Sequence, residues 1–173
     1  GHKKGSENLK NIASVCNEIG IKALSVYAFS TENWKRPKEE IDYLMDLPSE
    51  FEETFKGKFK EEDIRVIFSG RRDRFPEKVQ ELIGRVEEKT KDRKGLILNI
   101  CFDYGSYTEI LEGVKEISAL YKKGEIELDD INEELMSNHL YTRELPKLDL
   151  LIRTSGEERI SNFLLWQLAY SEL

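Results

Sequence analysis

The chain has 173 residues, of which 39% are hydrophobic and 35% are charged, and its formal net charge is −7. This length suits one domain with a real core and is too short for two ordinary ones. An acidic chain is poorly suited to non-specific nucleic-acid binding. No apolar run approaches the roughly 20 residues that cross a bilayer, so a membrane-spanning protein is not expected either.

The first half of the chain predicts an alternation of helices and strands. Apolar residues recur at helical spacing from 9 to 19, and Gly20 follows where a C-cap glycine belongs. The apolar segment 22–29 predicts a buried strand. Pro37 suits the first turn of the next helix, and we expect Pro48 to kink or end it.

The rest of the chain continues this alternation. Further elements are predicted at 63–69 (strand), 76–91 (helix), 96–102 (strand), 108–122 (helix), 148–152 (strand) and 162–170 (helix). We expect Gly124 to end the helix over 108–122, and Asp129 or Asp130 to cap a shorter helix that runs to Met136.

Strands that are apolar on both faces and alternate with helices are typical of an α/β fold with a mostly parallel central sheet flanked by helices. We expect residues 1–173 to form a single domain. Ligands of such sheets bind beyond the carboxyl ends of the strands. The chemistry is therefore expected in the segments that follow the strands, which are 30–36, 70–74, 103–106 and 153–161.

Segment 30–36 brings two hydroxyls, a carboxylate, an amide, an indole and a guanidinium into seven positions before a helix. A helix N-terminus and a nearby arginine such as Arg36 can hold a phosphate together. An ordinary capping loop, with Trp34 as a core residue, explains the same pattern about equally well.

Segment 153–161 places Arg153 and Arg159 around a glycine, together with three hydroxyl side chains. Arginine presents a planar fork to phosphate oxygens, so the segment predicts a diphosphate clamp. The alternative is that Glu157 and Glu158 pair with these arginines on the surface.

Other polar residues indicate less by themselves. His2 alone is expected to be solvated, and Arg71, Arg72 and Arg74 are expected to form a solvated charge cluster. Glu172, at the end of an apolar helix, is expected to be a surface residue. Cys16 and Cys101 stand in apolar surroundings, which predicts reduced core thiols, fits the cytoplasm and disfavours a structural zinc site.

No P-loop, dinucleotide fingerprint or Ser-His-Asp pattern is present in the sequence. The residues by themselves therefore predict an α/β enzyme with an anion site for a phosphorylated ligand.

Three stretches together resemble the cis-prenyltransferases of the undecaprenyl diphosphate synthase family. They are Tyr27 to Pro37, Asp149 to Glu157 and Arg159 to Gln167, and Ala169 to Leu173 also fits the resemblance. Members of this family condense farnesyl diphosphate with successive isopentenyl diphosphates and make a cis double bond each time. The product is the lipid carrier for cell-wall sugars. The resemblance also implies Mg²⁺, an apolar tunnel and a homodimer, and the apolar product is compatible with peripheral membrane contact.

The resemblance implies roles for individual residues. Asn33 matches the residue assigned as proton acceptor, and Glu172 matches a magnesium ligand, which reverses the surface assignment. Positions that match substrate contacts are His2, Ser30, Thr31, Glu32, Trp34, Arg36, Arg153, Arg159, Ile160 and Ser161. The far wall of the tunnel is expected at Leu96 and Leu98.

The sequence departs from the family pattern at both ends, because the aspartate-containing MDGNGRWA motif and the Arg-Gly-rich tail are not in it. We therefore expect negligible turnover from the sequence as written. Two alternatives stay open: a non-catalytic binding subunit of the same family that pairs with an active partner, and, more weakly, a phosphosugar- or nucleotide-binding α/β protein.

Overall fold

The computed structural model describes residues 2–173, without the side chains at positions 2–4, 6, 51, 55 and 58. Contacts between residues divide the chain into two compact units, Gly1–Asp103 (unit 1) and Tyr104–Leu173 (unit 2). The single domain therefore stays a prediction.

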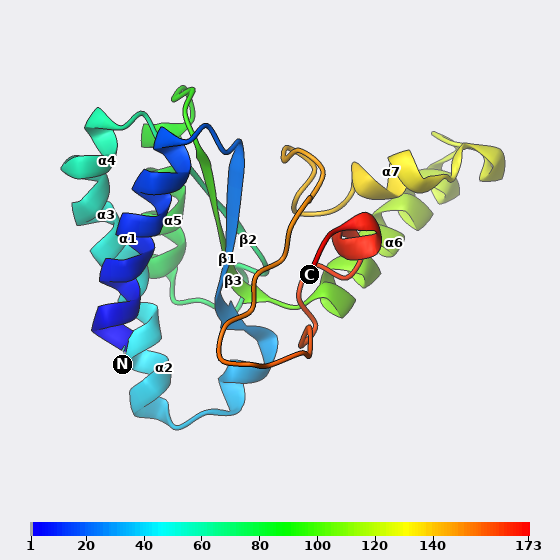
Figure 1. Ribbon diagram of the computed structural model, residues 1–173. Helices are drawn as coiled ribbons and strands as arrows, with labels where there is room; N and C mark the ends of the chain where they lie inside the picture. Colours follow the sequence, from blue (N-terminus) through cyan, green and yellow to red (C-terminus); the bar gives the residue numbers. More distant parts are fainter. Residues whose placement is uncertain (1) are drawn as a thin grey trace. The chain divides into compact units, whose positions relative to one another are not determined.

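Unit 1 is built on a three-stranded parallel sheet, as the strand pattern predicted (Figure 1). Its strands are β1 (Ala23–Ser30), β2 (Arg65–Ser69) and β3 (Ile97–Tyr104), in the order β1-β3-β2. The register of β2 on β3 runs from Arg65 opposite Ile97 to Ser69 opposite Cys101. All three strands lie within two residues of their predicted bounds.

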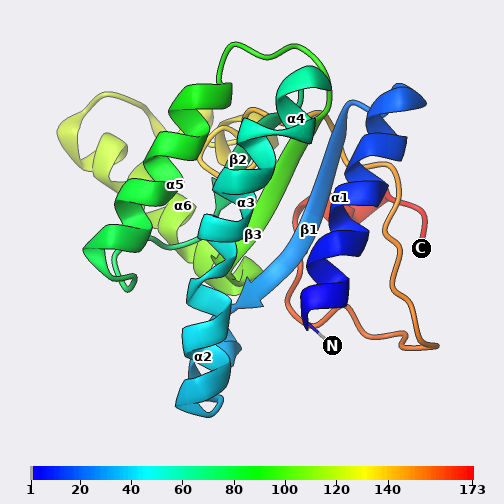
Figure 2. The same ribbon diagram turned by 90° about the vertical axis from the view of Figure 1, so that its left-hand side faces the viewer.

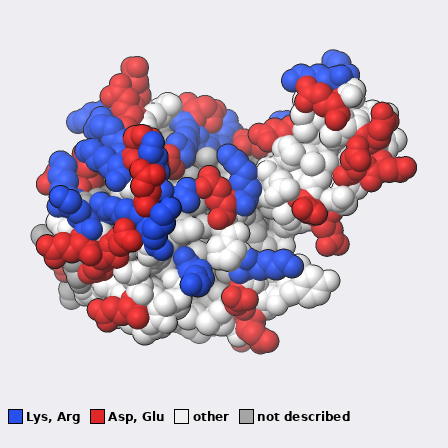
Figure 3. All heavy atoms as spheres, turned by 90° about the horizontal axis from the view of Figure 1, so that it is seen from above, with Lys and Arg blue, Asp and Glu red and all other residues white. Residues whose placement is uncertain are grey.

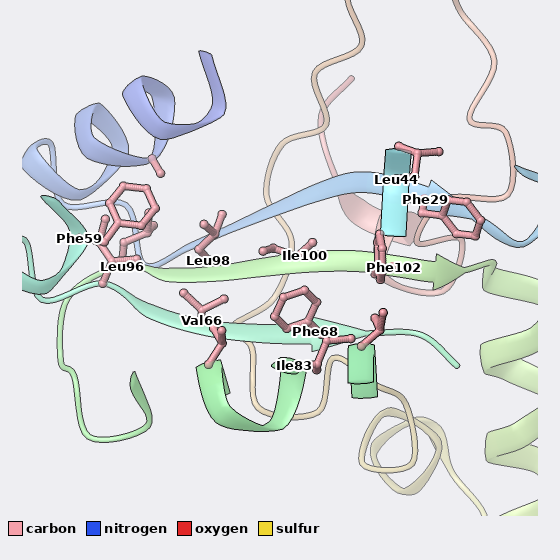
Figure 4. Close-up of a cluster of buried hydrophobic side chains, with 14 of the residues drawn as sticks. Phe29, Leu44, Phe59, Val66, Phe68, Ile83, Leu96, Leu98, Ile100 and Phe102 are labelled. Carbon is pink, nitrogen blue, oxygen red and sulfur yellow. The ribbon is translucent and has the colours of Figure 1, made fainter. Parts of the chain in front are cut away.

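The helices of unit 1 are α1 (His2–Glu18), α2 (Lys38–Met45), α3 (Leu47–Lys56), α4 (Lys58–Glu61) and α5 (Glu77–Thr90). Of these, α1, α3, α4 and α5 lie together on one side of the sheet (Figures 1 and 2). Alternate residues of β3, among them Leu98, Ile100 and Phe102, meet Val66, Phe68 and the helices in a buried apolar cluster (Figure 4). This packing supplies the hydrophobic stabilisation of the unit.

Two features of unit 1 differ from the sequence expectation. The break between α2 and α3 falls at Asp46, so Pro48 lies in the first turn of α3, where its missing N–H costs nothing. Helices α3 and α4 were not predicted as separate elements. The prediction of core thiols is confirmed, because Cys16 and Cys101 are both buried and neither is in a disulfide within the described residues.

The outer edge of β2 is covered by side chains of α5. The backbone N–H of Val66 donates to Thr90 Oγ1 at 3.0 Å, and that of Phe68 donates to Glu87 Oε1 at 2.9 Å. An edge strand with unpaired N–H groups invites pairing with another chain. In this unit the helix satisfies those donors.

Unit 2 contains α6 (Ser106–Lys123), the 3-10 turn η2 (Leu128–Asp130), α7 (Glu133–Ser137) and the 3-10 turn η3 (Gln167–Tyr170). Gly124 ends α6 as predicted, with a left-handed φ of 72°. The predicted cap of the short helix is wrong: Asp130 lies in η2, and Asn132 caps α7 by accepting the N–H of Leu135. Exposed acidic side chains gather around η2 and α7 (Figure 3).

The last two predicted elements are also wrong as drawn from the sequence. Segment 148–152 is not a strand but makes one parallel bridge, between Leu150 and Glu172, and Ile152 is 75% exposed. Segment 162–170 is helical only at η3, because Asn162 and Leu164 adopt left-handed φ angles of 62° and 48°. Within the described residues, no helix is long and apolar enough to cross a membrane.

Candidate active site

The first candidate loop lies directly beyond the carboxyl end of β1. Thr31–Lys35 form the 3-10 turn η1, with Ser30 as the N-cap in an extended conformation. A tight turn of this length keeps the polar side chains of segment 30–36 at the end of the sheet, where ligands of α/β proteins bind. Thr31 and Asn33 are partly buried, and Glu32 and Arg36 are exposed.

Asn33 is held by its own turn. Its Oδ1 accepts the backbone N–H of Ser30 at 2.9 Å, and the two residues face each other as in a capping box. Because this bond occupies the acceptor end of the carboxamide, the two N–H donors are at its other end. The geometry therefore favours Asn33 as a hydrogen-bond donor with a fixed orientation over Asn33 as a free base.

Trp34 points away from the turn into unit 1. Its indole packs edge-on against Phe29, with 5.1 Å between the ring centroids. The centroid of the Phe75 ring lies 6.0 Å from that of Trp34. The indole Nε1–H donates to Asp103 Oδ1 at 2.9 Å. Trp34 is therefore a partly buried anchor of the loop, which is the alternative that the sequence left open.

The arginines after β2 are not simply solvated. Arg71 pairs with Asp73 and Arg72 with Glu87, while Arg74 donates through both Nε and Nη2 to Asp103, which is fully buried. The predicted solvated cluster is thus wrong for Arg74, because the end of β3 offers it a buried carboxylate.

Charge near the first loop affects a neighbouring tyrosine. Burial raises the pKa of Tyr27, and the negative charge of Glu32 raises it further. Arg36 pairs with Glu40 one helical turn later at 3.2 Å, with both side chains about half exposed. Such a pair contributes little to stability and leaves the guanidinium accessible to an anion.

The second candidate loop belongs to unit 2. Arg153 Nη1 donates to Ser161 Oγ at 2.8 Å and also to the backbone carbonyl of Arg159. These bonds close the exposed loop 153–161 on itself, so Arg153 and Ser161 lie side by side. The surface-pairing alternative expected Glu157 and Glu158 to pair with both arginines, and Arg159 does pair with Glu157 at 2.6 Å.

The chain after this loop is fixed to the N-terminus of α6. The N-cap of α6 is Gly105, which has no side chain to accept the free N–H groups of the first turn. Asn162 takes this role: its carbonyl accepts the N–H of Ser106 and its Oδ1 that of Tyr107, both at 2.9 Å. Ser106 Oγ in turn accepts the N–H of Leu165. The left-handed backbone that breaks the predicted helix is what lets Asn162 reach these donors.

Glu172 is placed next to the start of the same loop. Leu151 N–H donates to the carbonyl of Glu172, and Glu172 N–H donates to that of Asp149, both at 2.9 Å. The backbone of Glu172 is therefore fixed beside Leu151, which lies two residues before Arg153. The side chain of Glu172 is exposed.

The side chains that could bind Mg²⁺ decide whether the described residues fit a magnesium site. Among the described residues, no group of three or more His, Cys, Asp or Glu side chains could enclose a metal ion. Mg²⁺ usually takes one or two carboxylates and completes its shell with waters and phosphate oxygens. Glu172 fits the role of one such carboxylate, but the described residues do not form a complete site.

Unit 2 contains a buried carboxyl of its own, that of Glu109. It is 1% exposed and accepts hydrogen bonds from the Tyr104 hydroxyl, the Tyr141 backbone N–H and Gln167 Nε2. Burial raises the pKa of Glu109, and these hydrogen bonds partly oppose the rise. Glu109 thereby links α6 to the first residue of η3.

The structure brings the predicted site residues together in two groups. Ser30, Thr31, Glu32, Asn33, Trp34 and Arg36 share one turn of unit 1, and Arg153, Arg159, Ile160, Ser161 and Glu172 lie around one loop of unit 2. The side chain of His2 lies outside the described residues. Sequence reasoning did not single out Asp103 or Glu109. Asp103 lies in the predicted segment 103–106, just after the predicted strand 96–102, whereas nothing in the sequence distinguishes Glu109 from a surface glutamate on a helix.

A parallel sheet flanked by helices, with a polar turn at the carboxyl end of β1, defines an α/β protein of the kind that binds ligands at this edge of the sheet. The family model described as "Putative undecaprenyl diphosphate synthase" matches residues 1–173. The chain therefore belongs to the undecaprenyl diphosphate synthase family, and it is a prenyltransferase.

Individual relatives agree with this assignment. The chain is 49% identical to the isoprenyl transferase of Lactobacillus johnsonii over 99% of its own length and 73% of that protein. It is 45% identical to a ditrans,polycis-undecaprenyl-diphosphate synthase of Micrococcus luteus, described as (2E,6E)-farnesyl-diphosphate specific. This match covers 99% of the chain and 69% of that protein. The crystal structure of lavandulyl diphosphate synthase from Lavandula x intermedia, in complex with dimethylallyl diphosphate, superposes with a TM-score of 0.91 at 35% identity. It is matched over 99% of this chain and 74% of that one.

Proposed function

We propose that this protein elongates an allylic diphosphate, farnesyl diphosphate, with isopentenyl diphosphate and releases a polyprenyl diphosphate of the undecaprenyl type. The observation that carries the proposal is that the family match spans residues 1–173, and so includes both candidate loops. The specificity in the name of the Micrococcus luteus relative supports farnesyl diphosphate as the primer.

We assign isopentenyl diphosphate to the loop of unit 2. Arg153 and Ser161 lie side by side there, and Arg159 and Ile160 belong to the same loop. A guanidinium, a hydroxyl and a second arginine supply the donors that diphosphate oxygens need. The ion pair of Arg159 with Glu157 is exposed, so a bound diphosphate can replace it at little cost.

We assign the reacting end of the substrates to the turn of unit 1. Elongation forms a carbon–carbon bond while the allylic diphosphate departs and a proton leaves the isopentenyl group. Asn33 is fixed through its Oδ1, so its N–H donors can orient a diphosphate oxygen that takes up this proton, rather than holding the proton itself. Ser30, Thr31, Glu32 and Arg36 are the proposed substrate contacts around it, and His2 is proposed near the allylic diphosphate. Trp34, whose indole packs into unit 1, is proposed to serve these contacts as the anchor of the turn.

Departure of a diphosphate requires that its negative charge be neutralised. We expect the exposed guanidinium groups of Arg36 and Arg153 to contribute this positive charge. Mg²⁺, with Glu172 as one protein ligand, supplies further charge neutralisation when it is bound.

The growing chain needs an apolar channel. Each added five-carbon unit contributes on the order of 3 kcal/mol when buried, at roughly 0.8 kcal/mol per CH₂ group, so the intermediate stays bound between steps. Leu96 and Leu98 face the apolar cluster of unit 1 and are the proposed far wall of this channel. A cytoplasmic homodimer with peripheral membrane contact completes the proposal.

The test is incorporation of radiolabelled isopentenyl diphosphate by the full-length gene product with farnesyl diphosphate and Mg²⁺, with the products sized by chromatography. We expect long-chain products. Arg153→Ala should raise the KM for isopentenyl diphosphate at least tenfold, while Arg143→Ala, an exposed arginine of the same unit outside the loop, should leave it unchanged. An unchanged KM in Arg153→Ala would refute the site assignment.

The same assay distinguishes the non-catalytic alternative. A pure binding subunit would incorporate no label alone and would stimulate an active partner. The relatives described above are all named as transferases or synthases, which supports the catalytic function.

A further inference from the structure

Asp103 is a buried carboxylate in an unfavourable backbone conformation. It lies at the end of β3, is 0% exposed, and has a φ of 49°. A left-handed φ is uncommon for a residue other than glycine, and a buried charge is costly unless it is paired and hydrogen-bonded. A residue that carries both costs needs compensating contacts.

The partners of Asp103 account for its placement. Trp34 Nε1–H donates to Oδ1 at 2.9 Å, and Arg74 donates to Oδ2 through Nε at 2.8 Å and to Oδ1 through Nη2. The Arg74 guanidinium also lies over the Trp34 ring, 5.3 Å from its centroid. Asp103, Arg74 and Trp34 are therefore in mutual contact, and we call them the Asp103 triad.

The triad fixes the turn that contains Asn33. Trp34 immediately follows Asn33 in η1, and its indole is held by the triad on one side and by Phe29 and Phe75 on others. The backbone of the turn is held at its start by the bond from Ser30 N–H to Asn33 Oδ1. Without the bonds to Asp103, the indole would be oriented by its ring packing on Phe29 and Phe75, as far as the described residues show, and the adjacent Asn33 would lose a directional constraint.

We propose that Asp103 and Arg74 are positioning residues for prenyl transfer, which hold Asn33 in place through Trp34. The inference rests on the function proposed above, because Asn33 matters only if the turn is where the substrates react. Misplacement of a reacting group by about 1 Å can cost on the order of a hundredfold in rate. The triad therefore acts on kcat, whereas the loop of unit 2 acts on isopentenyl diphosphate binding.

The hydrogen bond can be measured without any substrate. In a ¹H–¹⁵N spectrum of the full-length protein, the indole signal of Trp34 is identified by its disappearance in Trp34→Phe. We expect this N–H to be protected from exchange with solvent in the wild type. Asp103→Ala should shift the signal and increase its exchange rate at least tenfold.

The catalytic consequence is a split between the kinetic constants. Asp103→Ala and Arg74→Gln should each lower kcat at least tenfold and change the KM for isopentenyl diphosphate less than twofold. Asp103→Asn keeps an oxygen that can accept from Trp34, so it should restore the protection of the indole N–H and most of kcat. If Asp103→Ala does not fold, Asp103→Asn and Arg74→Gln still carry the test.

Arg72→Gln is the matched control. Arg72 lies in the same loop as Arg74 and is similarly exposed, but it pairs with Glu87. It should alter neither the Trp34 signal nor kcat.

Three results would overturn the inference. An unchanged Trp34 signal in Asp103→Ala would show that the indole N–H does not donate to Asp103. A kcat within twofold of the wild type, despite a changed signal, would reduce the triad to a structural role. An inactive wild type with a protected Trp34 N–H would overturn the proposed function, and the positioning role with it, while leaving the triad itself intact.

Discussion

Glu109 shows how one buried side chain makes the stability of this protein depend on pH. Its carboxyl accepts several hydrogen bonds from groups inside unit 2, yet burial still raises its pKa above the usual range of a glutamate. The folded state therefore binds the Glu109 proton more tightly than the unfolded state does. The stability that this carboxyl contributes is fully present at low pH and is lost as the pH rises through the raised pKa.

We predict that Glu109→Gln reduces this loss. Urea unfolding followed from pH 4 upward should give a smaller decrease in the free energy of unfolding for the variant than for the wild type. Glu109→Asp, which keeps an ionisable group, is the control and should retain the pH dependence. Parallel curves for the wild type and Glu109→Gln would contradict the prediction.

At the scale of elements, the contact between α5 and the edge of β2 depends on a buried hydroxyl. Thr90 is 0% exposed, and its Oγ1 accepts the Val66 N–H. Thr90→Val keeps the shape but leaves this donor without its acceptor, which costs about 1–3 kcal/mol in the free energy of unfolding.

Thr54→Val is the matched control for this substitution. Thr54 donates to the carbonyl of Glu50 in its own helix, which already serves that helix, so its replacement should cost less than about 1 kcal/mol. Equal losses in denaturant unfolding of the two variants would argue against the role of the edge bond.

The close approach of two strand ends requires glycine at position 70. A Cβ at Gly70 would lie 2.0 Å from the carbonyl oxygen of Phe102, and its φ is +139°. Because the obstructing atom belongs to the backbone of β3, Gly70→Ala should destabilise the fold by about 3 kcal/mol.

Gly84 in α5 provides the opposite case. A Cβ at Gly84 meets nothing within 4 Å, so Gly84→Ala should stabilise the protein by about 0.5–1 kcal/mol through helix propensity. Thermal melts of both variants measure the difference, and a stabilised Gly70→Ala would contradict the close approach of Gly70 to the backbone of β3.

For the whole molecule, the sequence predicted what depends on local patterns. Runs such as 96–102 are apolar enough to be buried strands in any arrangement, and Gly124 stops a helix whatever surrounds it. The sequence failed where long-range contacts decide. Segment 162–170 has helical spacing, but Asn162 is needed as a cap for α6, and this requirement overrides local preference.

The candidate site divides in the same way. The motifs located both loops, since motif residues are adjacent in the chain. The Asp103 triad joins residues that are far apart in sequence, so no local pattern could indicate it.

The two units lead us to predict how the molecule unfolds. The buried apolar residues of unit 2 are few, with Ile117, Met136 and Leu140 in one cluster, and a single core in fewer than about 80 residues rarely supplies more than about 5 kcal/mol. We therefore predict one cooperative transition in calorimetry for the whole chain, as a single domain requires. Two separate transitions would show that the units fold independently.

The side chains that α5 places against β2 also determine at which edge the sheet can accept a further strand. Thr90 and Glu87 of α5 already accept the outward N–H groups of β2. An additional strand at that edge of the sheet would therefore have to displace α5. β1 forms the opposite flank of the order β1-β3-β2. Any strand that extends this sheet, whether from elsewhere in the polypeptide or from another molecule, is thereby directed to the side of β1, beside the turn that carries Asn33.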